Sequence, residues 1–263
     1  MQSSRQRQFL YFLLLLSKGI GPMAIAEIRR AIDSAGQTED QVGAAVLDGY
    51  IPDHLPLKEK HSFAMQNAIS SGTLQRFRQE EARGNVVICP NDNAVPTYYW
   101  QRATAHQLPP VFIAKGQLPP INNEWVAVIG SRNASPAGLA RAAQAGCGNA
   151  LEGRVTVSGG ARGVDTAATT SASTSGGFSV IVPAEEVSTG KLLERQIMLS
   201  PYAPGTRFTP GLAMARNKVV VALSHHVIVA EINSNHSSKP SGTAHAVQMA
   251  ELFGVPVTLL NQT

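Results

Sequence analysis

Two short apolar runs in the middle of the chain are each followed by a turn that carries glycine and arginine. The first run, 126–129, leads into Gly130-Ser131-Arg132, and the second, 155–157, leads into the segment 158–163 (SGGARG). A helix-forming segment separates them. Strand, turn and helix in this order predict a parallel sheet whose turns emerge at one carboxyl edge. Backbone N–H groups at the two helix starts, with Arg132 and Arg162 beside them, would then form a phosphate-binding crevice.

The chain from residue 84 onward continues this alternation of strands and helices. Further strands are expected at 86–89, 111–114, 178–182, 197–199, 227–230 and 255–260, and helices at 191–195, 210–223 and 241–253. The alternation predicts an α/β fold, a Rossmann-like doubly wound and mostly parallel sheet, over residues 84–263.

Residues 1–83 are expected to form a small helical N-terminal domain. The apolar run 9–16 is too short for a bilayer, which needs about 20 residues, so it predicts a buried helix at 5–16 and no membrane segment. A Gly-x-Gly turn at 19–21 then leads into a second helix. This pattern fits either a helix-hairpin-helix that touches nucleic-acid phosphates or a plain αα-turn. Residues 57–83 are expected to form one long solvated helix, with Phe63, Ile69 and Leu74 packed inward.

Composition limits the possible functions. The net charge of +4 is compatible with a polyanionic partner, whereas an aromatic content of 6% excludes a broad base-stacking sheet. The two cysteines have no metal or redox spacing, which suits a reducing cytoplasm. His225 and His226 are adjacent on an expected strand and point to opposite faces, so one metal ion cannot easily take both. We expect a cytoplasmic protein without metal or cofactor.

Four motifs follow one another along the strand-and-helix part of the chain. They are Gly130-Ser131-Arg132, the segment 158–165 (SGGARGVD), Arg216-Asn217 followed by 218–224, and Ser241-Gly242-Thr243. In this order and spacing they resemble the DNA-processing proteins of the DprA family, also called Smf. The family equivalents are a GSR turn, SGxARGID, RNRxIxxLS and SGSLxTA. The turns at 90–96 and 19–22 resemble further segments of that family, so the resemblance covers most of the chain.

The resemblance implies a Rossmann-like fold that binds single-stranded DNA, usually as a homodimer, and that is not a catalyst. It also implies a role in natural transformation, where the family protects incoming strands and helps to load a RecA-like recombinase. The wider superfamily includes nucleotide-binding sensors and LOG-type nucleotide hydrolases. A small-nucleotide sensor or hydrolase is therefore the alternative, and a role in phage defence would suit either ligand.

The sequence departs from the family pattern in three places. The usual C-terminal winged helix is not expected, because Thr263 follows the last strand. The segment 182–191 (VPAEEVSTGK) replaces a longer GTGLDxxYPxxN segment. It puts Glu185 and Glu186 where a DNA groove would prefer no acids, with Lys191 as the compensating charge. Residues 172–177 are unusually small and polar.

The candidate residues for binding nucleic acid or nucleotide come from the four motifs. They are Gly130, Ser131, Arg132, Ser158, Gly159, Gly160, Arg162, Gly163, Arg216, Asn217, Lys218, Ser241, Gly242 and Thr243. Arginines would donate charge-assisted hydrogen bonds to phosphate, and glycines would allow close backbone approach. No catalytic residue is proposed.

Some of these residues have a second interpretation. Arg162 could pair with Asp165, three residues further on, and Asp165 would then order the turn. The segment 241–243 could be an ordinary helix cap. Glu231 is the one acid at a strand end that could serve hydrolysis, and Phe208 or Tyr202 could stack unpaired bases.

Overall fold

The computed structural model describes residues 3–188, 190–232 and 242–260. Its centre is an eight-stranded sheet of order β1-β2-β6-β5-β4-β3-β7-β8 in the described residues. Strands β3 to β8 pair in parallel, and β2 pairs antiparallel with both β1 and β6. The strands are β1 Val86–Ile88, β2 Phe112–Gly116, β3 Trp125–Gly130, β4 Val155–Ser158, β5 Phe178–Ile181, β6 Gln196–Ser200, β7 His226–Glu231 and β8 Val257–Leu259. This confirms the predicted Rossmann-like, mostly parallel α/β sheet.

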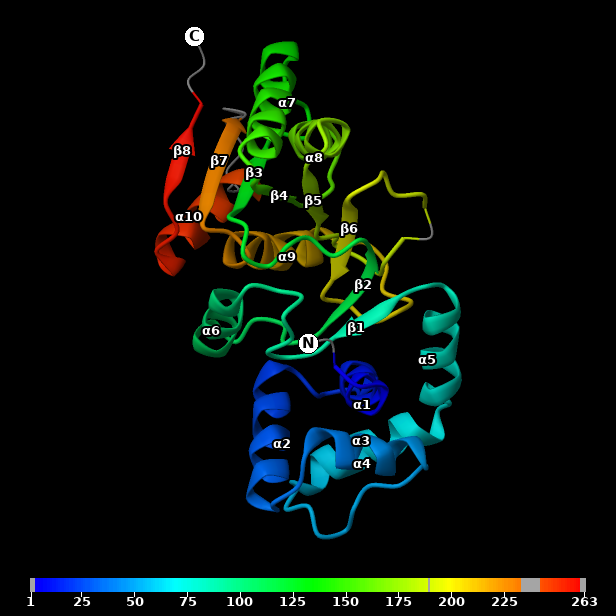
Figure 1. Ribbon diagram of the computed structural model, residues 1–263. Helices are drawn as coiled ribbons and strands as arrows, with labels where there is room; N and C mark the ends of the chain where they lie inside the picture. Colours follow the sequence, from blue (N-terminus) through cyan, green and yellow to red (C-terminus); the bar gives the residue numbers. More distant parts are fainter. Residues whose placement is uncertain (1–2, 189, 233–241, 261–263) are drawn as a thin grey trace.

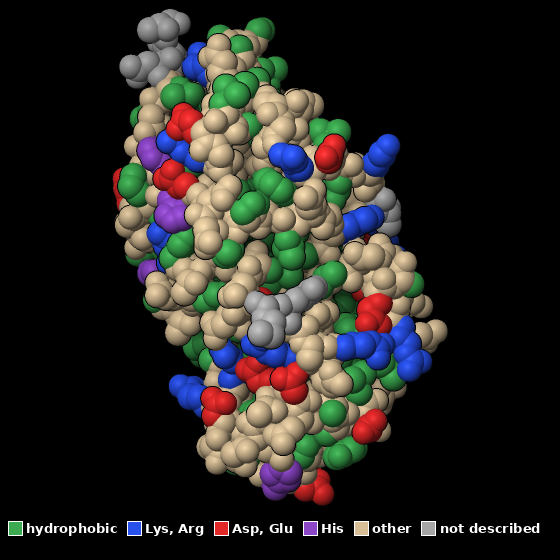
Figure 2. All heavy atoms as spheres, in the orientation of Figure 1, with side chains coloured by type: hydrophobic (Ala, Val, Ile, Leu, Met, Phe, Trp, Pro, Cys, Tyr) green, Lys and Arg blue, Asp and Glu red, His purple; other side chains and the backbone are tan. Residues whose placement is uncertain are grey.

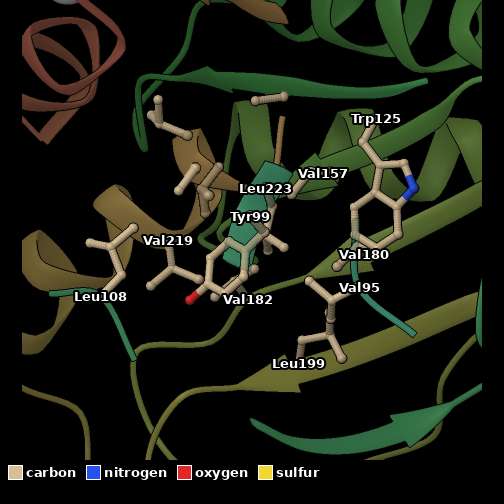
Figure 3. Packing of buried hydrophobic residues seen from close by; sticks show 14 of the residues in the cluster. Val95, Tyr99, Leu108, Trp125, Val157, Val180, Val182, Leu199, Val219 and Leu223 are labelled. Carbon is tan, nitrogen blue, oxygen red and sulfur yellow. The ribbon is translucent and has the colours of Figure 1, made fainter. Parts of the chain in front are cut away.

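Helices cover both faces of the sheet because the central strands bury residues on both sides (Figure 1). On β3, Val128 packs in a cluster with α7 and α8, whereas Ala127 and Ile129 face a cluster that includes α6, α9 and α10. Figure 3 shows Tyr99 of α6 among Val182, Val219 and Leu223 in the second cluster. The helices on this part are α6 Thr97–His106, α7 Pro136–Leu151, α8 Val164–Thr174, α9 Pro210–Ala222 and α10 Gly242–Phe253.

The helical part lies beyond the β1–β2 end of the sheet (Figure 1). It contains α1 Arg5–Leu16, α2 Pro22–Ser34, α3 Glu39–Leu47, α4 Glu59–Ser70 and α5 Thr73–Ala82. Helix α1 buries six consecutive residues, 9–14, as its apolar composition predicts. Its core cluster extends into the sheet and includes Val87 of β1 and Ile113 of β2. The helical part and the sheet thus share a packed boundary, and the division at residue 83 stays a prediction.

A network of charged side chains crosses that boundary. Arg7 of α1 donates hydrogen bonds to Glu39 of α3, to Asp92 and to the backbone oxygen of Pro90. Arg29 of α2 also donates to Glu39, at 2.8 Å. On the face shown in Figure 2, basic and acidic side chains lie side by side where the two parts meet. The network joins α1 and α3 to the turn that follows β1.

Three local predictions are wrong. Residues 57–83 form two helices, because Gly72 takes a left-handed φ of +80° between α4 and α5, and Phe63 is 67% exposed. No helix forms at 191–195, where the chain runs irregularly into β6. Helix α6 was not predicted. Its Arg102 and Tyr98 donate to backbone oxygens at the C-terminal end of α9.

None of the helices in the described residues is long and apolar enough to cross a membrane.

Candidate nucleic-acid interface

The two glycine- and arginine-bearing turns are in contact at the carboxyl edge of the sheet. The amide of Val164, the first residue of α8, donates to the backbone oxygen of Ser131 at 3.2 Å. A Cβ on Gly163 would lie 2.4 Å from that same oxygen, and Gly163 has a φ of +86°. Only glycine therefore fits at this position. Below the turns, the Ser158 hydroxyl donates to the backbone oxygen of Val128 at 2.6 Å and links β4 to β3.

The order of strands places a topological switch point next to this contact. From β3 the chain moves through β4, β5 and β6 on one side, and β7 and β8 lie on the other side. The β3–β7 pairing shifts register at Gly130, where the amide of Ser131 donates to the backbone oxygen of Glu231 at 3.0 Å. Ligands of doubly wound sheets bind in the crevice outside such a point. Gly130 and Ser131 line its base, and Ser131 is buried.

A carboxylate of the protein itself binds the loop that leads into α8. Asp165 accepts the backbone amide of Ala161 at 3.3 Å, and its carboxylate lies 3.7 Å from Nη1 of Arg216. Burial raises the pKa of Asp165, against the opposing effects of Arg216 and the Ala161 amide. The alternative pairing of Arg162 with Asp165 is wrong, because Arg162 donates instead to Asn133 Oδ1, at 2.9 Å.

A second carboxylate occupies the N-terminus of α7. Glu231 accepts the backbone amide of Ser135 at 2.8 Å and also its hydroxyl, and Arg141 lies 3.4 Å away. The hydrogen bonds from Ser135 lower the pKa of Glu231. A Cβ on Gly138 would lie 2.2 Å from the carboxylate, so the first turn of α7 closes tightly around it. Because both oxygens of Glu231 are engaged in capping, it is poorly placed to activate a water molecule for hydrolysis.

The outward side of the same turns remains open. The backbone amides of Gly160, Arg162 and Gly163 have no acceptor among the residues that the structure describes. The side chains of Arg132 and Arg162 are exposed beside them. Unpaired loop amides and guanidinium groups that point to solvent are the groups that bind phosphate.

An aromatic ring adjoins this open surface. The guanidinium carbon of Arg132 lies 5.6 Å from the ring centre of Phe208, which is 46% exposed. Tyr202, the other candidate for base stacking, is half-buried, and its hydroxyl donates to the backbone oxygen of Leu212 at 2.7 Å. Of the two rings, Phe208 offers the more accessible face.

The residues predicted on α9 have different environments. Arg216 is only 5% exposed and lies beneath the 158–163 loop, so the structure buries it where an open phosphate contact was expected. Asn217 donates to the backbone oxygen of Gly242 at 3.0 Å and ties α9 to the start of α10. Lys218 is exposed. Thr243 lies in the first turn of α10, and Ser241 is outside the described residues.

The two acids of the 182–191 segment line a separate groove. Glu185 and Glu186 face α5 across a groove of about 720 Å³ that Arg76, Arg83 and Lys115 also line. Glu186 accepts the backbone amide of Gly205 at 2.8 Å. Its carboxylate therefore braces the neighbouring loop.

The histidine pair has ordinary structural partners. His225 Nδ1 accepts the backbone amide of Trp125 at 3.2 Å, and His226 Nε2 lies 2.9 Å from the hydroxyl of Thr258. Burial raises the pKa of the Cys89 thiol to about 12. Within the described ranges, no group of three or more His, Cys, Asp and Glu residues is arranged to hold a metal ion.

Fold and site together define a Rossmann-like α/β protein with a pair of glycine- and arginine-bearing turns at its switch point. The family model described as DNA recombination-mediator protein A matches residues 86–263, and the chain belongs to this family. The chain is 30% identical over 176 residues to the DNA processing protein DprA of Streptococcus pneumoniae. That match spans 62% of the chain and 61% of the relative, so it leaves about two fifths of the relative unmatched.

Two solved structures are similar to the chain. The X-ray structure of DNA processing protein A from Streptococcus pneumoniae has a TM-score of 0.74 at 23% identity, and the match covers 100% of this chain and 88% of that one. A structure of DNA processing protein A from Helicobacter pylori, described for its single-stranded DNA binding mode, has a TM-score of 0.50 at 24% identity. That match covers 59% of this chain and 74% of the other. These likenesses support the fold.

Proposed function

We propose that the protein binds single-stranded DNA without catalysing a reaction. The phosphate backbone would cross the open side of the paired turns. Arg132 and Arg162 would contact phosphates together with the amides of Gly160 and Gly163. Phe208 would stack an unpaired base beside them.

The observation that carries the proposal is that internal carboxylates already bind the start of α7 and the loop that leads into α8. In nucleotide-binding sheets of this type, the pyrophosphate sits at a helix N-terminus. Here Glu231 binds the amide of Ser135 at the start of α7, and Asp165 binds the amide of Ala161 in the loop before α8, so both carboxylates would repel a phosphate that approached them. Among the described residues of the two turns, Arg132, Arg162 and the amides of Gly160 and Gly163 remain available, which suits a strand that lies across the turns better than a nucleotide that enters the crevice. The single-stranded DNA binding described for the Helicobacter pylori protein supports the same ligand class.

On the basis of the family resemblance, we also propose a role for the protein in the cell. We propose that the protein acts as a homodimer in the cytoplasm and helps to load a RecA-like recombinase onto the bound strand, in transformation or in a related defence role.

The test is direct binding of fluorescent oligo-dT at several salt concentrations. For single strands, the slope of log K against log salt changes by about 0.7 for each phosphate contact, so Arg132→Ala should weaken binding and flatten the slope by about that amount. Arg154→Ala is the matched control. Arg154 precedes β4, at the opposite edge of the sheet, and pairs with Glu124 and Glu152.

The alternative ligand class is tested in the same assay. Nucleoside mono- and triphosphates added to millimolar concentration should not displace oligo-dT. Absence of oligo-dT binding at low salt, or binding that Arg132→Ala leaves unchanged, would contradict the proposal. Release of free base from a nucleoside monophosphate would instead support a hydrolase.

A further inference from the structure

Arg216 fills the space that a side chain at position 159 would need. A Cβ built on Gly159 would lie 1.0 Å from Nη1 of Arg216 and 2.2 Å from its Cζ. The guanidinium is therefore packed directly against the backbone of the first glycine in the 158–163 loop. Because Gly159 has no side chain, the loop backbone can lie directly against the Nη1 end of the guanidinium.

The surroundings of Arg216 hold it in that position. Its side chain is 5% exposed and comes from α9, a helix that packs on the opposite face of the sheet from α7 and α8. Nη1 lies 3.7 Å from Asp165, and Asp165 in turn accepts the amide of Ala161 in the same loop. Nε of Arg216 is buried and has no hydrogen-bond partner in the part of the chain that the structure describes.

A buried guanidinium with an unpaired nitrogen is costly, since a buried donor without an acceptor loses the hydrogen bond that it would make with water. The contacts that Arg216 makes with the loop must outweigh this cost. Arg216 supports Gly159 from below, and through Asp165 it fixes Ala161 from the side. The open amides of Gly160 and Arg162 lie next to these two anchored residues.

We infer that Arg216 is a positioning residue of the DNA site: it holds the 158–163 loop in the shape that turns its amides toward the phosphate, and it does not contact the strand itself. The inference rests on the proposed function and changes the role that the sequence motif suggested for Arg216. Its partner in this role is Gly159, whose lack of a side chain accommodates the guanidinium.

The first experiment separates positioning from contact. Arg216→Met keeps the bulk of the side chain and removes its charge, and Asp165→Asn in the same protein avoids an unpaired buried carboxylate. Oligo-dT affinity of this double variant should fall roughly tenfold, about 1.4 kcal/mol, while the slope of log K against log salt stays at the wild-type value. Arg132→Ala provides the comparison, because loss of a true phosphate contact flattens the slope. A double variant whose slope flattens as much as that of Arg132→Ala would overturn the inference.

The second experiment uses the overlap between positions 159 and 216. Gly159→Ala alone should weaken oligo-dT binding roughly tenfold, because its Cβ would displace the guanidinium from its position under the loop. In an Asp165→Asn, Arg216→Ala background, the same Cβ enters the space that the guanidinium has left. There Gly159→Ala should change affinity by less than about threefold. Equal losses in both backgrounds would show that the guanidinium is not what excludes the Cβ.

A third measurement does not depend on the ligand. Backbone amide exchange at Gly160 and Arg162 should quicken in Arg216→Met, Asp165→Asn, while exchange in α7 stays unchanged. Quickened exchange throughout the sheet domain would show general destabilisation and would contradict a local positioning role. If wild-type protein fails to bind oligo-dT, the proposed function fails, and the exchange pattern still decides whether Arg216 orders the loop.

Discussion

Glu231 and Ser135 join the end of β7 to the start of α7, with the carboxylate accepting the Ser135 amide at 2.8 Å. Asp165, in the first turn of α8, accepts the amide of Ala161 in the loop before that helix. A helix N-terminus attracts anions because its first amides are unpaired and its dipole is positive there. In this protein Glu231 satisfies the start of α7, and Asp165 satisfies the loop that leads into α8. Ligand binding is thereby directed to the loop groups that remain exposed.

The Glu231 cap predicts a specific pH dependence of stability. Because its pKa is lowered in the folded protein, Glu231 stabilises the fold above its ordinary value of 4.5. That contribution is lost as the pH falls through the lower, folded value. Glu231→Gln should therefore reduce the free energy of unfolding by about 1–2 kcal/mol at neutral pH, and the difference from wild type should shrink in acid. Urea unfolding across a pH series measures both the loss of stability at neutral pH and its decrease in acid.

The control for this prediction is Glu251→Gln on α10, an exposed position where substitutions usually change stability by less than about 0.5 kcal/mol. A difference between Glu231→Gln and wild type that stays constant down to strongly acidic pH would show that the charge of Glu231 does not stabilise α7.

Phe208 is predicted to contribute a base-stacking contact. Its exposed ring lies beside Arg132, where a base attached to a bound phosphate could reach it. Phe208→Ala should weaken oligo-dT binding by about 1–3 kcal/mol, and Phe208→Trp should retain most of the affinity. Phe63→Ala removes an exposed ring from the helical part and should leave binding unchanged. Equal affinities of the Phe208→Ala variant and wild type would exclude stacking at this position.

The sequence was sufficient to predict the sheet and the contact between its two turns. The buried runs 126–129, which is apolar, and 155–157, in which apolar residues alternate with Thr156, lead into turns that carry glycine, so strand, turn and edge followed from local pattern. The crevice itself followed from parallel topology, which brings Ser131 and Gly163 together.

The pairing of charges within the site could not be predicted, because it depends on contacts between distant segments. Asp165 lies three residues after Arg162, yet Arg162 donates to Asn133 instead. The carboxylate of Asp165, on α8, lies close to Arg216, on α9. Ser135 and Glu231 are separated by 96 residues. The sequence did hold one usable signal, since serine before proline is a common helix start and Pro136 is the first residue of α7.

Helix α6 was missed for a similar reason. Arg102 donates to the backbone oxygens of Ala222 and Ser224, at 2.9 and 2.8 Å, and Tyr98 donates to that of Leu223. Its side chains thus complete the C-terminal end of α9, about 120 residues later, a role that no local pattern reveals. In 57–83, the abundance of charged residues likewise concealed the break at Gly72.

This capping of α9 is itself testable. Arg102→Met removes both hydrogen bonds from a partly buried guanidinium and should lower the free energy of unfolding by about 2–3 kcal/mol. Tyr98→Phe removes one bond and should cost about 1 kcal/mol. Thermal or urea unfolding of the two variants gives the comparison. Stability equal to wild type in both would mean that the ends of α9 are satisfied without α6.

Arg7 is predicted to hold the helical part on the sheet. Its guanidinium contacts the carboxylates of Glu39 and Asp92, whose side chains are 15% and 2% exposed. Arg7→Met would leave both acids with fewer partners in a poorly solvated site, and removal of one member of such a buried network costs about 3–5 kcal/mol. Arg5→Met is the matched control on the same helix, because Arg5 pairs with Glu81 at the exposed surface, where a pair contributes about 0–1 kcal/mol. Urea unfolding followed by amide exchange should show a large loss for Arg7→Met, with α1 and α3 exchanging first, and little change for Arg5→Met. Similar small losses for the two variants would mean that the apolar contacts of α1 alone secure the boundary.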